Sequence, residues 1–420
     1  MIRYTAFGLA LVASVILCAC GGGGGSSSTP GFVKVIAVPN VGPGTNFSFD
    51  ISAVDGAKGR MYFTDRNNKS VDVIDVKTNT FLKQITGGFA GCNTGPTCVG
   101  ANNDMSGPDG LNLITGTTFI YVGDVNSVKI IDTSSDTVVN TVAIGGTSGL
   151  RADEGCYDPD HKIFMINSPG ESPPFATFID VNTQKIIATL LFTDPGTGAT
   201  GPASAGLEAC VYDTGTKTFL VNNDGSTANP RGEVDVIPVS FVQTGTPAAP
   251  VILTLPVPTP ANGFKIFPLG NCDPTGLDLG PGTDVAVSCR QGVAGEPLTV
   301  QILDRTNGTV RATVPIGGGD QIAFDGPTNR YYLAASRWTK SGLSSGPSCS
   351  AASPCTPVLG IIDASSRTLA QTAFSGNNAH SVGVDPVTHR VYMPFSSSTA
   401  PGGCSTCDNV PTGGVLVFQE

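Results

Sequence analysis

The stretch SVDVIDVKTNTFLKQI (Ser70–Ile85) decides the fold, because it holds two short apolar segments joined by a polar turn. Asp75 opens the turn, where its carboxylate can accept a hydrogen bond from the backbone amide two residues further on. Short apolar segments without a helical period are typical of β-strands. The stretch therefore predicts an antiparallel hairpin.

The same hairpin recurs along the chain, which indicates a repeat architecture. Each further copy ends its first strand with an aspartate at the turn. The copies are SVKIIDTSSDTVVNTVAI (Asp132), FATFIDVNTQKIIATLLF (Asp180), LTVQILDRTNGTVRATVPI (Asp304) and LGIIDASSRTLAQTAF (Asp363). We assign these five aspartates a structural role only.

A second kind of hairpin precedes each repeat, as in FDISAVDGAKGRMYFTD (Phe49–Asp65), and seven of them occur. Six are followed by a hairpin of the first kind, counting a degraded copy, EVDVIPVSF…VILTLPV, in which Pro238 replaces the turn aspartate. The seventh is followed only by the lone strand GGVLVFQE at the C-terminus. A spare strand, FVKVIAVP (Phe32–Pro39), lies at the other end.

The spare strand can complete the last repeat and close a ring. An open sheet edge is an aggregation liability, and ring closure removes it. We therefore expect the strand at about 32–39 to pair with the C-terminal blade. The sequence predicts an all-β fold, a seven-bladed β-propeller built as a single domain over residues 32–420.

Two sets of motifs resemble known propeller families. VIDVKTNTFLKQI and IIDTSSDTVVNTVAIGG resemble the YVTN-type repeat, while HSVGVDPVTHRVY and QIAFDGPTNRYY resemble inner hairpins shared with NHL-like and gluconolactonase-like propellers. The resemblance covers residues 32–420, but these framework motifs imply blades and no particular activity. The asparagine-containing metal-ligand set of the gluconolactonase-like family has no clear equivalent here.

The N-terminus resembles the export signal of a bacterial lipoprotein. Arg3 precedes an apolar run, and LCAC (Leu17–Cys20) resembles the lipobox, in which the signal is cut before a cysteine that is then acylated. We expect a signal peptide over residues 1–19, then a lipidated Cys20 and a Gly/Ser tether over residues 20–31. No aspartate follows Cys20, which favours the outer membrane, facing the periplasm or the cell surface.

Charge and hydropathy restrict the partners. The formal net charge is −10, and such a surface repels phosphate backbones, which argues against nucleic acid. No segment after the signal is long enough to span a bilayer, so acyl chains are the expected membrane anchor. We expect a monomer.

Ten of the twelve cysteines follow Cys20, and an even number in an exported protein predicts disulfides. Spacing, the facing ends of a hairpin and elimination indicate five pairs among several connectivities that stay open: Cys92–Cys98, Cys349–Cys355, Cys404–Cys407, Cys272–Cys289 and Cys156–Cys210. The Cys404–Cys407 spacing also occurs in redox motifs, but without a strand-to-helix context we interpret it as a loop staple.

One rim of the propeller is predicted to carry the long connections. In a four-stranded blade, the second-to-third and blade-to-blade connections share a rim, which we call the long-loop face; the other rim is the short-turn face. The long segments are 87–108, 167–176, 193–205, 222–232, 256–272, 337–357 and 396–413. Binding often resides in such loops, so we expect a protein, peptide or saccharide partner on this face. Drift in unconstrained loops is the alternative.

A ring of polar residues is predicted at the mouth of the central channel. Aligning the first strands of the seven blades places these residues at their starts: Asp50, Asp109, Asp153, Glu208, Asp273 (one position out of register), Asp320 and His380. Glu154 adjoins the third. Confined carboxylates raise one another's pKa and attract cations, and their oxygens suit Ca²⁺ or another divalent cation better than Zn²⁺. The alternative is that these acids only bond strand-end amides of the next blade.

The remaining candidates are weaker. Trp338 with Arg337, at the root of a long loop, could stack a ligand, although such a pair more often packs the base of the loop. His161 and His389 fall in short hairpin turns, where a surface role is the better interpretation. No nucleophile elbow, phosphate loop or zinc-protease motif occurs.

Two functions fit the sequence. The first is a non-enzymatic lipoprotein that binds a ligand or protein through the long-loop face. The alternative is a divalent-metal-dependent hydrolase or lyase, resembling the gluconolactonase-like propellers, that acts at the channel mouth with His380 or Glu208 as the base.

Overall fold

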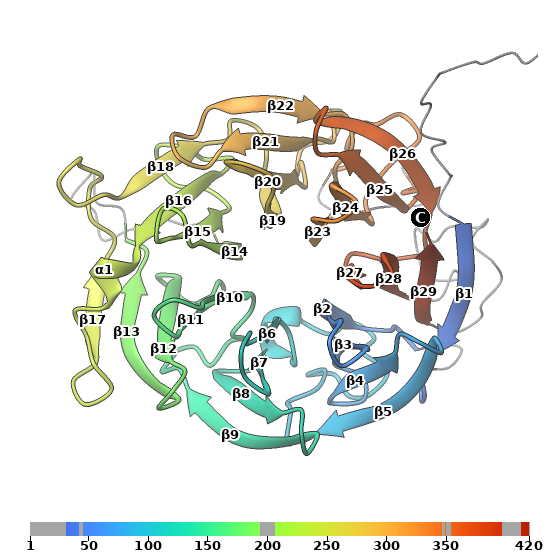
Figure 1. Cartoon of the computed structure of the whole chain (residues 1–420), viewed down its shortest axis with the longest axis horizontal. Coiled ribbons are helices and arrows are strands. Elements are labelled where there is room, and N and C mark those ends of the chain that lie inside the picture. The colour runs from blue at the N-terminus through green and yellow to red at the C-terminus, as the bar shows by residue number, and fades with distance from the viewer. Residues whose placement is uncertain are drawn as a thin grey trace, which may run out of the picture.

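The computed structural model describes residues 31–41, 45–193, 206–346, 349, 354–396 and 413–419. These residues form seven β-sheets, which stand as blades around a central channel (Figure 1). The predicted all-β seven-bladed propeller is therefore confirmed. The signal, Cys20, the tether and the Cys404–Cys407 pair lie outside the described residues.

Blades 1 to 3 follow the chain in order. Blade 1 comprises β2 (Phe49–Asp55), β3 (Arg60–Asp65), β4 (Ser70–Asp75) and β5 (Thr80–Thr86). Blade 2 comprises β6 (Leu111–Leu113), β7 (Phe119–Asp124), β8 (Ser127–Asp132) and β9 (Thr137–Ala143). Blade 3 comprises β10 (Gly155–Asp158), β11 (Ile163–Ser168), β12 (Phe175–Asp180), β13 (Lys185–Leu191) and, as a fifth strand, β17 (Val251–Thr254).

Blades 4 to 7 complete the ring. Blade 4 comprises β14 (Leu207–Asp213), β15 (Thr218–Asn223), β16 (Glu233–Pro238) and β18 (Lys265–Pro268). Blade 5 comprises β19 (Pro274–Leu279), β20 (Asp284–Cys289), β21 (Val300–Asp304) and β22 (Val310–Val314). Blade 6 comprises β23 (Ile322–Asp325), β24 (Arg330–Ala335), β25 (Val358–Asp363) and β26 (Thr368–Phe374). Blade 7 comprises β27 (Gly383–Val384), β28 (Arg390–Phe395), β29 (Gly414–Gln419) and β1 (Gly31–Ala37).

The chain ends meet in blade 7, as predicted. β1 pairs antiparallel with β29, from Gly31 opposite Gln419 to Ala37 opposite Gly414 (Figure 1). Because β29 begins at the long-loop face, Gly31 lies at the short-turn face.

The aspartates at the hairpin turns act as predicted. The Asp75 carboxylate accepts hydrogen bonds from the backbone amides of Lys77 and Thr78, both at 2.8 Å. The turn aspartates of the other copies accept equivalent bonds from amides two or three residues further on. These bonds satisfy backbone donors in the turn, which fixes the hairpins of the short-turn face.

Blade 4 corrects one expectation. The segment VILTLPV was expected to be its fourth strand, but β17 pairs in parallel with β13 at the outer edge of blade 3. Pro238 replaces the turn aspartate, and the short helix α1 (Val239–Val242) follows where a hairpin turn was expected. The chain then returns as β18, within the segment expected to be a loop, and pairs with β16.

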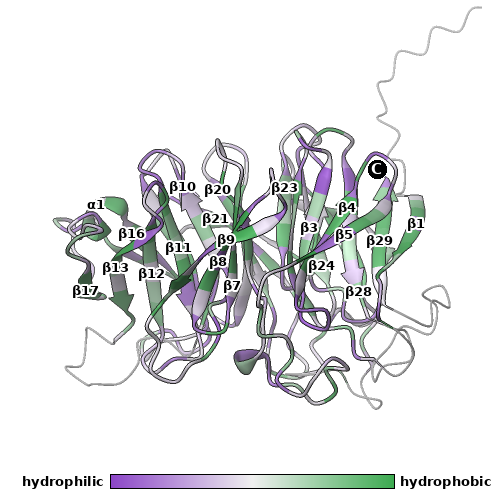
Figure 2. Cartoon of the chain, turned by 90° about the horizontal axis from the view of Figure 1, so that it is seen from below, coloured by the Kyte–Doolittle hydropathy of each residue, from purple (hydrophilic) through white to green (hydrophobic). Residues whose placement is uncertain are grey.

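The apolar core lies between the blades. Each hydrophobic cluster draws on neighbouring sheets; one joins Ile36 of β1 and Tyr392 of β28 to Met61 and Phe63 of β3. Figure 2 shows apolar residues along the upright strands and larger loops at the lower rim than at the upper. Among the described residues, no helix has the length and apolarity that crossing a membrane demands.

Candidate functional site at the channel mouth

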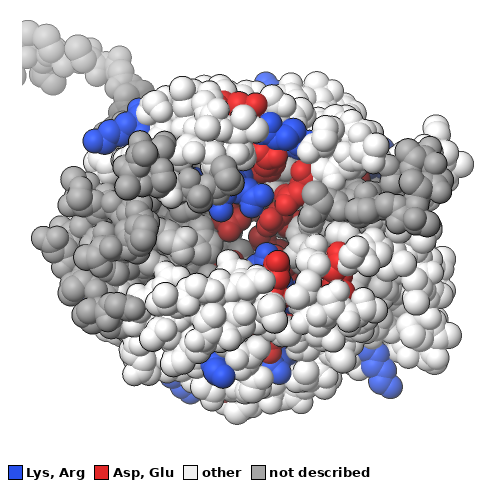
Figure 3. All heavy atoms as spheres, turned by 180° about the vertical axis from the view of Figure 1, so that it is seen from behind, with Lys and Arg blue, Asp and Glu red and all other residues white. Residues whose placement is uncertain are grey.

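The long-loop face opens into a cavity of about 540 Å³ at the centre of the ring. Figure 3 shows acidic and basic side chains gathered in this hollow. Five of the seven predicted ring residues line it, namely Asp50, Asp153, Glu208, Asp320 and His380. Glu154 also lines it, so the structure brings most of the predicted ring to one place.

The first strands of neighbouring blades pack closely, and this brings the side chains of the ring near one another. Gly110 lies so near the next blade that a Cβ atom there would come within 2.0 Å of the Asp153 carbonyl oxygen. A Cβ atom at Gly276 would likewise come within 2.1 Å of the Asp320 carbonyl oxygen. Larger residues at these two sites would push the blades apart, so glycine permits the close spacing of the ring.

Gln321 fixes the part of the ring where the chain closes. Its side-chain oxygen accepts hydrogen bonds from the Val382 amide at 3.0 Å and the Ser381 hydroxyl at 2.7 Å, and its NH₂ group donates to the Ser52 carbonyl at 2.8 Å. One amide therefore joins blades 6, 7 and 1. This link holds Asp320, His380 and Asp50 in a fixed relation.

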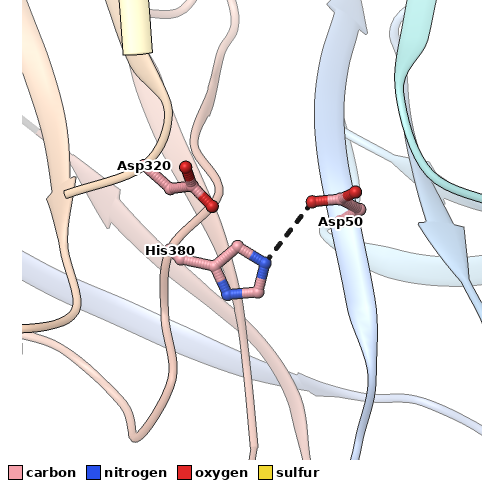
Figure 4. A group of neighbouring side chains, drawn as sticks. All are labelled: Asp50, Asp320 and His380. Carbon is pink, nitrogen blue, oxygen red and sulfur yellow. Dashed lines mark ion pairs between the residues drawn. The ribbon is translucent and has the colours of Figure 1, made fainter. Parts of the chain in front are cut away.

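His380 lies between Asp50 and Asp320 (Figure 4). Its Nδ1 atom is 2.7 Å from the Asn378 carbonyl oxygen, its Nε2 atom is 3.6 Å from Oδ1 of Asp50, and its ring stacks on Phe49 at 4.5 Å. A carbonyl can only accept a hydrogen bond, so Nδ1 carries a proton, and Nε2 then faces a carboxylate. Burial acts to lower the pKa of His380, but Asp50 and Asp320 outweigh it and raise that pKa above its usual value.

Two buried arginines neutralise the neighbouring acids. Arg66 donates to Asp50 at 2.7 Å and contacts Asp109, which is completely buried behind the cavity wall. Arg151 pairs with Asp153 at 2.8 Å. Burial acts to raise the pKa of Asp50, yet Arg66 and His380 lower it to about 2. Burial raises the pKa of Asp153 to about 7 against the pull of Arg151.

A second group of acids lies across the cavity with few counter-charges. Carboxylate oxygens of Glu154, Glu208 and Asp320 lie within 4.8 Å of one another. Burial, and then the neighbouring carboxylates, raise the pKa values of Glu154 and Glu208 well above their usual range. Arg290 is only loosely placed, at 3.9 Å from Glu208 and 3.8 Å from Asp224.

Arg337 lines the same cavity. Within the described part of the chain its guanidinium makes no hydrogen bond or ion pair; only its backbone amide is bonded, to the Gly318 carbonyl. Burial, and then the positive charge of Arg290, lower its pKa. A largely desolvated guanidinium without an anion is costly unless a ligand supplies one.

The two halves of the cavity therefore differ in charge. With its three acids ionised and His380 protonated, the first half is formally neutral, because Asp50, Asp109 and Asp153 face Arg66, Arg151 and His380. The other half sets the lining carboxylates of Glu154, Glu208 and Asp320 against Arg290 and Arg337, and Asp224, outside the cavity lining, also faces Arg290. With the three lining acids ionised, the formal charge of this half is −1, so it can accept cationic groups.

Three acidic groupings have the spacing of a metal site, and they differ in suitability. The groups Asp50–Asp320–His380 and Asp50–Asp109–Asp153 include acids already paired with arginine or with the His380 cation. Glu154, Glu208 and Asp320 offer carboxylate oxygens, and the guanidinium beside them, that of Arg290, is only loosely placed at 3.9 Å from Glu208, which suits a hard divalent cation such as Ca²⁺. This group fits a metal best.

Asp273 lies apart from the cavity lining. Its carboxylate accepts hydrogen bonds from Arg231 at 2.8 and 2.6 Å, in a cluster with Glu296 on the long-loop face. The other two histidines lie at short turns as predicted: His161 contacts Asp158 of its own turn, and His389 contacts Asp325 of the neighbouring blade, both through Nδ1.

Arg66, Arg151 and Arg290 were missed from the sequence, and Arg337 was considered only as a stacking partner of Trp338, although a signal was present. Arg66, Arg290 and Arg337 each follow the second strand of a blade, at the long-loop end. Aligning the second strands as the first strands were aligned would have placed these three beside the ring. Arg151 precedes Asp153 by two residues and had no such repeat to reveal it.

Four of the predicted disulfides are confirmed: Cys92–Cys98, Cys156–Cys210, Cys272–Cys289 and Cys349–Cys355. Cys156–Cys210 joins β10 to β14 and thus ties two neighbouring first strands of the ring together. Cys349 lines the cavity.

Comparison with known proteins supports the architecture and no more. No protein-family model and no curated protein sequence matches the chain. Among solved structures, a chain of hydrazine synthase from Kuenenia stuttgartiensis superimposes with a TM-score of 0.57, at 13% identity, covering 87% of this chain and 96% of its own length. At that identity the likeness concerns the fold alone, and the YVTN-type and NHL-like resemblance stays a prediction.

Proposed function

We propose that this protein is an exported, non-enzymatic propeller that binds a small charged molecule in the cavity of the long-loop face. The observation that carries the proposal is the charge in one half of the cavity, where three lining carboxylates face a loosely placed Arg290 and an Arg337 that pairs with no described side chain. The volume of about 540 Å³ is in the range of small-molecule sites. A macromolecular partner on the surrounding loops, whether protein, peptide or saccharide, is compatible with the same face.

His380 supports binding over catalysis. A general base needs a free lone pair, but Nδ1 faces a carbonyl oxygen and Nε2 faces a carboxylate. The raised pKa of His380 favours the protonated ring, which has no lone pair free to accept a proton. Glu208, whose pKa is raised, is the better candidate base if the site proves catalytic.

A lipid anchor at Cys20 would attach on the side away from the cavity. Gly31 lies at the short-turn face, opposite the long loops. A tether of about ten residues reaches roughly 35 Å at most. Acyl chains on Cys20 would therefore keep the short-turn face toward the membrane, and the cavity would face away from it. Substituting Cys20→Ala should abolish labelling by a fatty-acid analogue and release the protein from membranes; unchanged labelling would refute the anchor.

The binding proposal is tested on the lipid-free domain, residues 31–420. Thermal shift with a panel of small cations, anions and zwitterions should show stabilisation by at least one class. Asp320→Asn should abolish that shift, whereas Asp160→Asn, at an exposed residue of the short-turn face, should not. If no class of probe shifts the melting temperature, the cavity is not a binding site.

A metal-dependent hydrolase or lyase is the second candidate, and one observation favours it. Glu154, Glu208 and Asp320 could hold a divalent cation, which would supply Lewis-acid chemistry at the channel mouth. In that case Glu208 would have two roles, as a ligand of the ion and as the group that transfers a proton. Hydrolysis of lactone or ester substrates that depends on added Ca²⁺, and is lost in Glu208→Gln, would support this function over simple binding.

A further inference from the structure

We propose that the small molecule bound at the channel mouth is a zwitterion, whose ammonium group lies among Glu154, Glu208 and Asp320 and whose carboxylate pairs with Arg337. The inference rests on the proposed binding function and names its ligand class. It is carried by the presence, in one cavity, of an acidic trio and a guanidinium, that of Arg337, which pairs with no described side chain.

The acidic trio is arranged to accept a cation. Its three side chains come from blades 3, 4 and 6, so they converge from different directions. Among the described residues none of the three carboxylates accepts a hydrogen bond, and the nearest cation is Arg290 at 3.9 Å from Glu208. An ammonium group carries three N–H donors, which matches three carboxylates.

Arg337 is arranged to accept an anion. It follows β24 of blade 6, the blade that also supplies Asp320, so the guanidinium and the trio share a wall. The planar guanidinium suits two-point recognition of a carboxylate. Arg290, tied loosely to Glu208 and Asp224, can turn toward the same anion.

Neither charge alone satisfies the cavity. A simple cation in the trio leaves the half-buried Arg337 without an anion, and a simple anion at Arg337 is repelled by the acids around it. A molecule that carries both groups a few ångströms apart satisfies both ends and orients itself in doing so. The cavity therefore favours a zwitterion over a plain anion or a plain amine.

The carbon skeleton of the ligand has a place to lie. Next to the cavity lies a second space of about 270 Å³ that is lined by both polar and apolar residues, among them Asn112, Leu113 and Asp278. Glu154 borders both spaces. This mixed lining can receive either an apolar body or one that carries a further polar group.

The test compares matched probes on the lipid-free domain by isothermal titration calorimetry. The zwitterions are glycine, L-leucine, L-phenylalanine, γ-aminobutyrate and 6-aminohexanoate, which vary the body and the separation of the charges. Butylamine and butyrate carry one charge each. We expect at least one zwitterion to bind ten-fold or more tightly than either single-charge probe. Arg337→Gln and Asp320→Asn should each weaken that binding ten-fold, and Lys77→Gln, at an exposed turn of the short-turn face, should leave it unchanged.

The outcomes separate this inference from the proposed function. If butylamine or Ca²⁺ binds as tightly as the best zwitterion, and Arg337→Gln has no effect, the zwitterion is wrong while a binding cavity remains. If butyrate binds best, the acidic trio has been assigned the wrong role and the inference also fails. If no probe of any charge binds, both the inference and the proposed function fall.

Discussion

Nε2 of His380 lies 3.6 Å from Oδ1 of Asp50, across the junction at which blade 7 meets blade 1. This is the junction that the two ends of the chain close, because β1 completes blade 7 just before the chain enters blade 1. The pair therefore connects the electrostatics of the channel mouth to the closure of the ring.

The His380–Asp50 pair should make stability depend on pH in a defined direction. The folded pKa of His380 lies above the unfolded value near 6.5. The stabilisation is therefore fully present below about pH 6.5 and is lost as the pH rises through the folded pKa. Histidine NMR signals should show the raised pKa, and Asp50→Asn should lower it. As the control, the signals of His161, at the short-turn face, should be the same in Asp50→Asn as in the unaltered protein. An unchanged His380 titration in Asp50→Asn would contradict the assignment.

A buried acid pair in blade 1 should have a similar pH dependence for a different reason. Burial raises the pKa of Asp65 to about 6, and burial together with Asp65 raises the pKa of Asp72 well above its usual range. The folded state thus binds more protons than the unfolded state, and stability should fall as the pH rises from about 4 to 6 and above. Asp72→Asn should stabilise the protein at pH 7.5 by on the order of 1–3 kcal/mol, with the difference disappearing near pH 4. Denaturant unfolding at the two pH values checks this; equal stability of both proteins at pH 7.5 would sink it.

The fold could be predicted from the sequence because each blade repeats the same local chemistry. Asp75 and its counterparts mark one turn in blade after blade, so even uneven loops do not hide the period. The prediction failed where that chemistry changed. Pro238 cannot supply the side-chain acceptor, and the next apolar segment found a free edge on β13 before the chain returned as β18.

The candidate site was half predictable for a physical reason. The acids open the first strands, and the alternating geometry of a strand fixes where such residues point. Whether each stays in the cavity depends on cations from other segments, which the alignment of first strands could not reveal. Arg231 holds Asp273 away, and Arg66 buries Asp109 behind the wall. The net charge of the cavity could therefore be predicted only once the positions of these arginines were known.

A divalent cation, if it binds the acidic trio, should stabilise the folded protein. Binding to the native state alone adds about 2.7 kcal/mol when the ion is at one hundred times its dissociation constant. We expect Ca²⁺ to raise the melting temperature and a chelator to reverse the rise. Asp320→Asn and Glu208→Gln should abolish the effect, and Asp160→Asn should keep it. An identical melting temperature with Ca²⁺, Mg²⁺, Mn²⁺ and chelator would exclude a metal and the metal-dependent enzyme with it.

The disulfides should contribute unequally to stability. Cys156–Cys210 closes a loop with a sequence separation of 54, whereas Cys92–Cys98 has a separation of 6. In the chain-entropy account, the longer loop contributes about 2 kcal/mol more. The double variant Cys156→Ala/Cys210→Ala should therefore unfold at lower denaturant than Cys92→Ala/Cys98→Ala. The reverse order would mean that local packing, and not chain entropy, governs these bridges.

Removing β1 should open the ring. Residues 31–37 supply the edge strand of blade 7, where Ile36 is buried and the Phe32 ring meets Phe418 at 6.3 Å. A chain beginning at Pro39 loses this ladder and the burial of Ile36, about 1.5–3 kcal/mol on its own, and exposes the edge of β29. We expect a lower melting temperature and soluble oligomers in size-exclusion chromatography, because an unpaired edge recruits further strands.

A chain beginning at Gly31 is the matched control and should remain monomeric. Ile36→Ala, which keeps the ladder but loses the packing, should destabilise without oligomerisation; if it oligomerises as readily as the deletion, packing and not the open edge is responsible.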